Sequence, residues 1–153
     1  MDIASALLAY METDKGDTDR DPYGLGRFLR TCTDAERTAA LELLAAAALD
    51  DGVLSESERT MLDAHAAGEA GAHVQRALAV VQAAMPFAGD AVRRRFLADR
   101  ADVVRSAEER ERLLGACVAV LENAAAPNLE ARCLLFQSAL GLSDAVLARL
   151  RKR

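Results

Sequence analysis

Apolar residues recur along the chain with the spacing of α-helices, and no stretch alternates with the period of two that marks a strand. The clearest helix is expected over residues 33–51, where an Ala/Leu-rich run follows Thr33-Asp34-Ala35-Glu36. This tetrapeptide is a capping box, in which the first hydroxyl and the last carboxylate each accept a backbone N–H of the other residue. The run Ala45 to Ala48 is small on every side, so we expect this helix to be central and mostly buried.

Capping residues and helix breakers place the other helices. Ser55 with Glu58 and Ser106 with Glu109 form two more capping boxes, and Gly141 is placed to end a helix. Further helices are therefore expected over residues 2–12, 22–31, 55–67, 72–85, 90–97, 106–124, 127–140 and 143–150. The sequence predicts an all-α fold, as one compact domain of about seven to nine helices.

An internal repeat appears when the sequence is shifted by 72 residues, because the segment from position 41 then lies over the segment from position 113. The shift places Asp50, Asp51 and Glu58 over Glu122, Asn123 and Glu130. We expect two pseudo-repeated helical hairpins, repeat one over 33–70 and repeat two over 106–153, with connecting helices over 71–105. An N-terminal helix and an acidic loop precede them over 1–32. A pseudo-twofold arrangement would pack the two central helices together.

Composition and charge indicate which kinds of partner the protein is suited to bind. The 153 residues are 52% apolar, rich in Ala and Leu, and carry a net charge of −5. Residues 1–70 hold 15 acidic and 6 basic side chains, whereas residues 71–153 hold 9 acidic and 13 basic ones. The acidic half argues against nucleic acid as the main partner, because binding depends on neutralising phosphates. The basic clusters at 93–95 and 149–153 leave an anion or RNA alternative open.

Cysteines and apolar runs predict the compartment. Cys32, Cys117 and Cys133 have no metal-binding or redox spacing, and their odd number indicates a reducing environment. The N-terminus lacks the basic start of a secretory signal, and the apolar run over 43–49 is too short to span a membrane. We expect a cytoplasmic protein without a transmembrane segment.

The acidic loop matches the EF-hand calcium-binding pattern only at its start. Asp17, Asp19 and Asp21 alternate like the start of an EF-hand calcium loop, but its sixth position is Pro22 and its twelfth is Phe28. The expected structure is therefore a solvated acidic loop.

A zinc site and a catalytic site are also unsupported. His65, Glu69 and His73 would share a face of an unbroken helix, but Gly68 and Gly71 interrupt it, which predicts two surface histidines. The sequence contains no Ser–His, Cys–His or phosphate-loop pattern, so we do not expect an enzyme.

An electrostatic misfit marks the corner at Asp50-Asp51. A helix C-terminus carries partial negative charge, so two carboxylates there are unfavourable without a nearby positive charge. No Lys or Arg lies between Arg37 and Arg59. Water, a cation or a basic group of a partner could compensate. The alternative is a purely structural corner, in which Gly52 ends one helix and a capping box starts the next.

The string Asp51-Gly52-Val53-Leu54-Ser55-Glu56-Ser57-Glu58 resembles the ADG-x-[I/V]-S-x-x-E signature of TerB-like (tellurite-resistance protein B) domains. The resemblance extends over about residues 30–150. It implies an all-α fold with two pseudo-repeats, a role in stress or tellurite resistance, no known catalytic activity, and an acidic surface proposed to bind a divalent cation or a partner. Such domains also occur in DnaJ-like membrane co-chaperones, so the implied protein partners include a membrane-associated complex.

On that pattern the candidate metal ligands are Asp50, Asp51, Glu58 and Glu130. The second copy departs from the family, since Asn123-Ala124 stands where Asp-Gly is expected. Any cation should therefore bind mainly at the first corner, and oxygen ligands alone favour Ca²⁺ or Mg²⁺. The alternative function is a helical adaptor for proteins, or a weak anion- or RNA-binding module, with no metal.

Overall fold

The computed structural model describes residues 24–49, 56–64, 68–85, 87–123 and 127–152. Every regular element in these ranges is an α-helix, which confirms the all-α prediction. The helices are α2 (Leu25–Thr31), α3 (Asp34–Ala48), α4 (Glu56–Ala64), α5 (Glu69–Ala84), α6 (Asp90–Ala101), α7 (Ala107–Asn123), α8 (Leu129–Ala139) and α9 (Asp144–Arg151).

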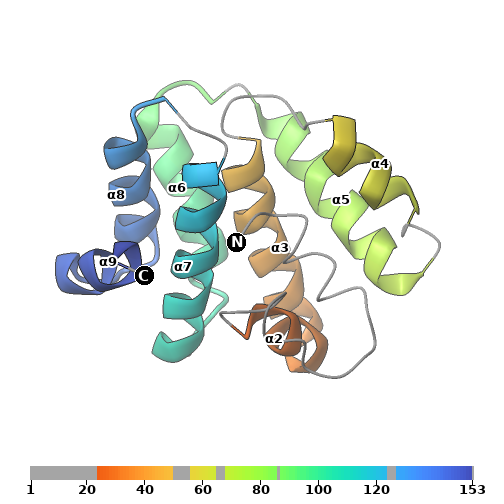
Figure 1. Cartoon of the computed structure of the whole chain (residues 1–153), viewed down its shortest axis with the longest axis horizontal. Coiled ribbons are helices and arrows are strands. Elements are labelled where there is room, and N and C mark those ends of the chain that lie inside the picture. Colours follow the sequence, from red (N-terminus) through yellow and green to blue (C-terminus); the bar gives the residue numbers. More distant parts are fainter. Residues whose placement is uncertain (1–23, 50–55, 65–67, 86, 124–126, 153) are drawn as a thin grey trace.

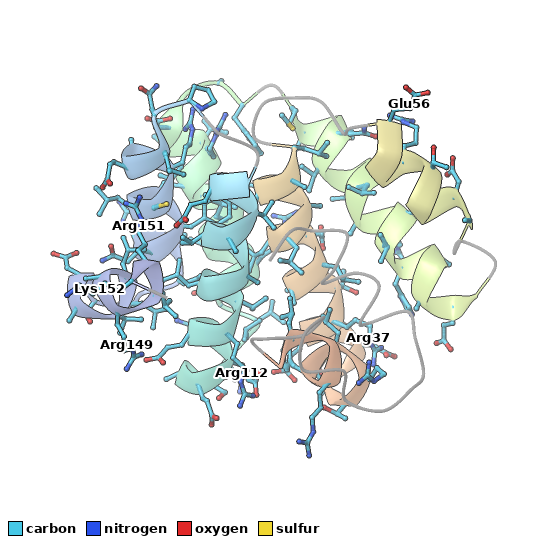
Figure 2. All side chains as sticks on the ribbon, viewed as in Figure 1. Arg37, Glu56, Arg112, Arg149, Arg151 and Lys152 are labelled. Carbon is cyan, nitrogen blue, oxygen red and sulfur yellow. The ribbon has the colours of Figure 1, made fainter. Side chains whose placement is uncertain are left out.

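Helices α3 and α7 pack side by side in the middle of the molecule (Figure 1). Helix α5 lies against α3 on one side, and α8 and α9 lie against α7 on the other. The smaller helix α2 contacts both central helices, and α6 contacts α3 and α8. The Sγ of Cys117 lies 3.9 Å from the carbonyl oxygen of Leu43, so the two central helices approach closely.

The core is mainly aliphatic, and Phe28 and Phe136 are its buried aromatic residues. The whole run from Ala39 to Leu49 is buried, which confirms that α3 is a central helix. In α2 Leu25, Phe28 and Leu29, which share one face at helical spacing, are buried as well. Because alanines occupy much of α3, four neighbouring helices can pack against it at short range.

In the described residues, the predicted N-cap residues Thr33 and Ser106 lie at the starts of α3 and α7. The N–H of Glu36 donates to the Thr33 hydroxyl at 3.2 Å, and the N–H of Thr33 donates to the Glu36 carboxylate at 3.3 Å. The Ser106 hydroxyl accepts the N–H of Glu109 at 3.4 Å. The box at Ser55 lies outside the described residues.

Two helix boundaries differ from the sequence prediction. Gly71 does not interrupt a helix, because α5 begins at Glu69 and passes through Gly71, which is buried. A buried glycine costs about 1 kcal/mol in helix propensity, and tertiary packing outweighs that amount. Helix α6 begins at Asp90, as expected, and Gly89, with a φ of 105°, precedes it. Helix α6 also continues to Ala101, beyond the expected end at residue 97.

Each long central helix carries one arginine that hydrogen-bonds to the helix before it, Arg37 in α3 and Arg110 in α7. Arg37, four residues after the Thr33 cap, donates to the carbonyl oxygens of Leu29 at 2.6 Å and Cys32 at 3.4 Å. Arg110, four residues after Ser106, makes the same type of contact.

Arg110 is the more connected of the two. Its guanidinium donates to the carbonyl oxygens of Val104 at 2.5 Å, Ala101 at 2.9 Å and Leu140 at 3.0 Å. It therefore joins the ends of α6 and α8 to the start of α7. The shared geometry of Arg37 and Arg110 is compatible with the predicted repeat, whose pseudo-twofold relation stays a prediction.

Candidate functional site

The first corner follows the C-terminal end of α3. The N–H of Leu49 donates to the carbonyl oxygen of Ala45 at 2.9 Å, and the last turn of α3 contains no basic residue. Asp50 and Asp51 come next in the chain and lie outside the described residues. The helix end that creates the electrostatic misfit is thus described, and the two carboxylates themselves are not.

Glu58 belongs to α4, although the position of its side chain lies outside the description. Helix α4 packs against α5, and the Gln75 amide of α5 donates to Asp63 of α4 at 3.3 Å. This hairpin forms one edge of the molecule (Figure 1).

Glu130 lies in the first turn of α8, at the opposite edge from α4 (Figure 1). Its exposed carboxylate pairs with Arg151 of α9, at 2.5 Å from the guanidinium. The hydrogen bond that Arg151 donates to Glu130 raises the pKa of Arg151 above its usual value. The structure therefore does not bring Glu130 together with the helix that carries Glu58.

The N-cap positions of the two central helices indicate a different alignment of the two repeats from the one that sequence identity gives. Thr33 and Ser106, the caps of the central helices, are 73 positions apart, one more than the sequence shift of 72. At a spacing of 73, Glu130 corresponds to Ser57 and Asn123 corresponds to Asp50. Glu130 is thus displaced from the position assigned to it by sequence identity alone.

A basic side chain whose position the linear sequence does not indicate lies near the end of α3. Arg93 of α6 lines a small cleft with Ala46 and Leu49. The other lining residues are Met85, Phe87, Leu97 and Phe136. The guanidinium of Arg93 lies 5.2 Å from the ring centre of Phe87, in cation–π geometry. The sequence offers only the spacing of Phe87 and Arg93 as a signal for this contact.

A second arginine of α6 makes an ion pair in the interior. Arg100 lies 3.3 Å from the carboxylate of Glu42, which is 7% exposed in the middle of α3. The same guanidinium stacks on Phe96, 3.6 Å from the ring centre. The pair joins α3 to α6 across 58 positions of sequence, which is why no local pattern indicates it.

The histidines, the acidic loop and the cysteines are the other candidate residues that the sequence offered. His73 lies 3.6 Å from Glu69 within α5, and His65 and the acidic loop at Asp17 to Asp21 lie outside the described residues. Burial raises the pKa of the Cys117 and Cys133 thiols, and both are free. Within the described part of the chain, no group of three or more His, Cys, Asp or Glu side chains is arranged to hold a metal ion.

Comparison of the chain with protein-family models found no match, and comparisons with curated proteins and with solved structures found none either. The resemblance to TerB-like domains therefore rests on the sequence, chiefly on the string over residues 51–58. No helix in the described ranges is both long and apolar enough to cross a membrane.

Proposed function

We propose that the chain is a non-enzymatic TerB-like helical module, acting in a stress or tellurite-resistance type of response. Its acidic corner after α3 binds a divalent cation or a basic group of a partner protein. The observation that carries this proposal is the way α7 ends. Glu122 lies in the last turn of α7, and a guanidinium from another helix, Arg151, lies 3.6 Å from its carboxylate. A carboxylate at the negative end of a helix is thus compensated by a cation at the second corner.

The same physical requirement applies to the corner after α3. Two carboxylates, Asp50 and Asp51, follow a helix end whose last turn has no basic residue. Carboxylate oxygens favour Ca²⁺ or Mg²⁺ over zinc or copper. Glu58 completes the proposed ligand set. Glu130 does not belong to it, because it lies on the far edge of the molecule and already pairs with Arg151.

A second candidate function is a helical protein adaptor without a metal, and the position of Arg93 favours it. Arg93 lines the same cleft as Leu49, so a positively charged side chain of the chain itself lies next to the end of α3. The RNA version of this alternative has less support. Arg110, Arg112, Arg149 and Arg151 of the basic half all contact carbonyl oxygens or carboxylates of the same chain.

Thermal unfolding with added cations tests the proposal. Millimolar Ca²⁺, Mg²⁺ or Mn²⁺ should raise the melting temperature, because a ligand that binds only the folded state stabilises it. Asp51→Ala should remove that rise. Glu130→Gln is the matched control, since it removes one carboxylate at the opposite edge and should leave the rise intact.

The two candidate functions give different results in the same assay. If Arg93 is the counter-charge of the corner, wild-type protein should show no response to any of the three cations, and Arg93→Gln should create one. A wild-type melting curve that no cation moves would reject the metal-binding proposal. Binding of RNA at low salt, lost at higher salt, would instead support the basic second half.

A further inference from the structure

The central helix α3 is buried all the way round its axis. Every residue from Ala39 to Leu49 is at most 8% exposed, and five of them are completely covered. This run makes about three helical turns, so its side chains point in every direction around the helix. Each side of α3 is therefore covered by some part of the chain.

One side of α3 faces α6. Glu42 pairs with Arg100 of α6 at 3.3 Å, and Ala46 and Leu49 line a small cleft with Leu97 of α6. The three α3 residues are four and three positions apart, so they lie on one face of the helix. Helix α6 covers this face.

The opposite side, which we call the outer face of α3, consists of Ala40, Leu44 and Ala47. At about 3.6 residues per turn these three point roughly away from α6, and all are 0% exposed. Figure 1 shows α7 and α5 on the two sides of α3, and α2 at its first turns. Arg37 reaches the carbonyl oxygen of Leu29 there. Among the described helices, those packed on α3 thus leave the rest of its outer face to be covered by another part of the chain.

The segment over residues 2–12, which lies outside the described residues, has the sequence pattern that this face requires. Ile3, Leu7 and Met11 recur every four positions, and Ser5 and Ala9 fall on the other side of the expected helix. Such a helix is about 16 Å long, whereas the outer face extends over about 11 Å. The segment is long enough to cover the whole face.

Reach and charge also favour this segment. Residues 13–24 connect it to α2 and can extend over about 40 Å, more than the length of α3. Residues 12–21 carry five acidic and two basic side chains. The charged residues of α2, to which they are joined, are Arg27 and Arg30. Opposite charges therefore favour a connection that lies along α2 and delivers the segment to the outer face.

We propose that residues 2–12 pack as an amphipathic helix along the outer face of α3, with Leu7 against Leu44. The outer face is a docking surface for a helix with one apolar side, and the N-terminal segment of the same chain is its occupant. This inference goes beyond the proposed function, because it concerns a helix-binding surface and does not depend on a cation.

Two matched variants of the full chain test the proposal. Leu7→Asp places a charge on the docked side of the segment, and Ala9→Asp places the same charge on the other side. Leu7→Asp should lower the melting temperature by about 5 °C, because a buried leucine contact is lost. It should also increase the fluorescence of the dye ANS, which binds exposed apolar surface, and shift the amide resonances of Ala40, Leu44 and Ala47. Ala9→Asp should do none of these.

A synthetic peptide of residues 1–14 provides the complementary measurement. Added to the Leu7→Asp protein, it should lower the dye fluorescence in a saturable way and return the amide resonance of Leu44 toward its wild-type position. The same peptide carrying Leu7→Asp should have no effect. If Leu7→Asp does not fold, Leu7→Ala removes the apolar contact without adding a charge, and the same measurements apply to it.

Two results would overturn the inference. One is equal dye fluorescence and equal amide shifts in Leu7→Asp and Ala9→Asp. The other is a shift of the Leu44 amide in Leu54→Asp but not in Leu7→Asp, which would assign the cover to the connection over residues 50–55. The proposed function is tested separately, by the cation response that depends on Asp51.

Discussion

Replacing Arg110 should destabilise this fold more than replacing any exposed arginine. Arg110 is half-buried, and its guanidinium donates to three backbone carbonyl oxygens, those of Ala101, Val104 and Leu140. Ala101 is the last residue of α6, Val104 lies in the loop between α6 and α7, and Leu140 follows the end of α8. Alanine at this position removes the guanidinium from all three carbonyl oxygens, of which that of Ala101 keeps the N–H of Val104 at 3.0 Å, and it removes a positive charge from two helix C-termini.

The magnitude follows from the number and type of these bonds. A hydrogen bond to a charged group contributes about 1.5–3 kcal/mol, and water can replace part of it at a half-buried site. We therefore expect Arg110→Ala to lower the free energy of unfolding by about 3 kcal/mol. For a chain of this length that corresponds to a drop in melting temperature of about 10 °C. Arg110→Lys should lose about half as much, because one ammonium cannot reach three carbonyls with the geometry of a guanidinium.

Urea unfolding measures this loss, provided that the slope of the unfolding free energy against urea concentration is the same in all variants. The control is Arg112→Ala, two residues away on the same helix. Among the residues that the structure describes, Arg112 pairs with Glu108 and Glu109, at 2.8 Å and 2.7 Å, and its side chain is 37% exposed. Such surface pairs contribute less than about 1 kcal/mol. A loss below about 1 kcal/mol for Arg110→Ala, or a loss equal to that of Arg112→Ala, would refute the reasoning.

Three other expected outcomes concern single features of the fold. Thr33→Ala should cost about 1 kcal/mol in urea unfolding, because it removes one half of a capping box, and an unchanged midpoint would contradict this role. Glu42→Ala should cost about 2 kcal/mol, because it leaves Arg100 partly buried without its carboxylate. A double-mutant cycle with Arg100→Ala should show coupling, and additive losses would argue against the ion pair. Burial raises the pKa of Cys117 above the ordinary thiol value of 9.0, so the unfolded chain loses this proton first and stability should fall as the pH rises above 9. The fall between pH 9 and pH 10 should be steeper in wild type than in Cys117→Ala, and equal slopes would disprove the contribution of this thiol.

Local signals in the sequence predicted much of the helical framework. The Thr33 and Ser106 caps start α3 and α7 as expected, because a capping box depends on two residues three positions apart. The buried face of α2 and the central place of α3 also follow from helical spacing and from the small size of alanine. The reading of Gly71 as a helix breaker was wrong, because the propensity of one glycine is smaller than the packing energy of a sixteen-residue helix.

The candidate site could be predicted only in part. The misfit at the end of α3 was visible in the sequence, since it needs only a helix end, two carboxylates and a local lack of basic residues. The assignment of Glu130 to the same site was not supported by its position. Sequence identity at a shift of 72 aligned it with Glu58, whereas the fold places it on another edge, paired with Arg151.

What the sequence determined by itself is therefore the set of helices, their capped starts and their apolar faces, all of which depend on neighbours within one or two turns. The tertiary structure determined which groups the arginine side chains contact. Arg93, Arg100, Arg110 and Arg151 each find partners on other helices, at separations that no periodic pattern encodes. Long flexible side chains can reach many positions, and only the packed helices select which carboxylate or carbonyl oxygen each one meets.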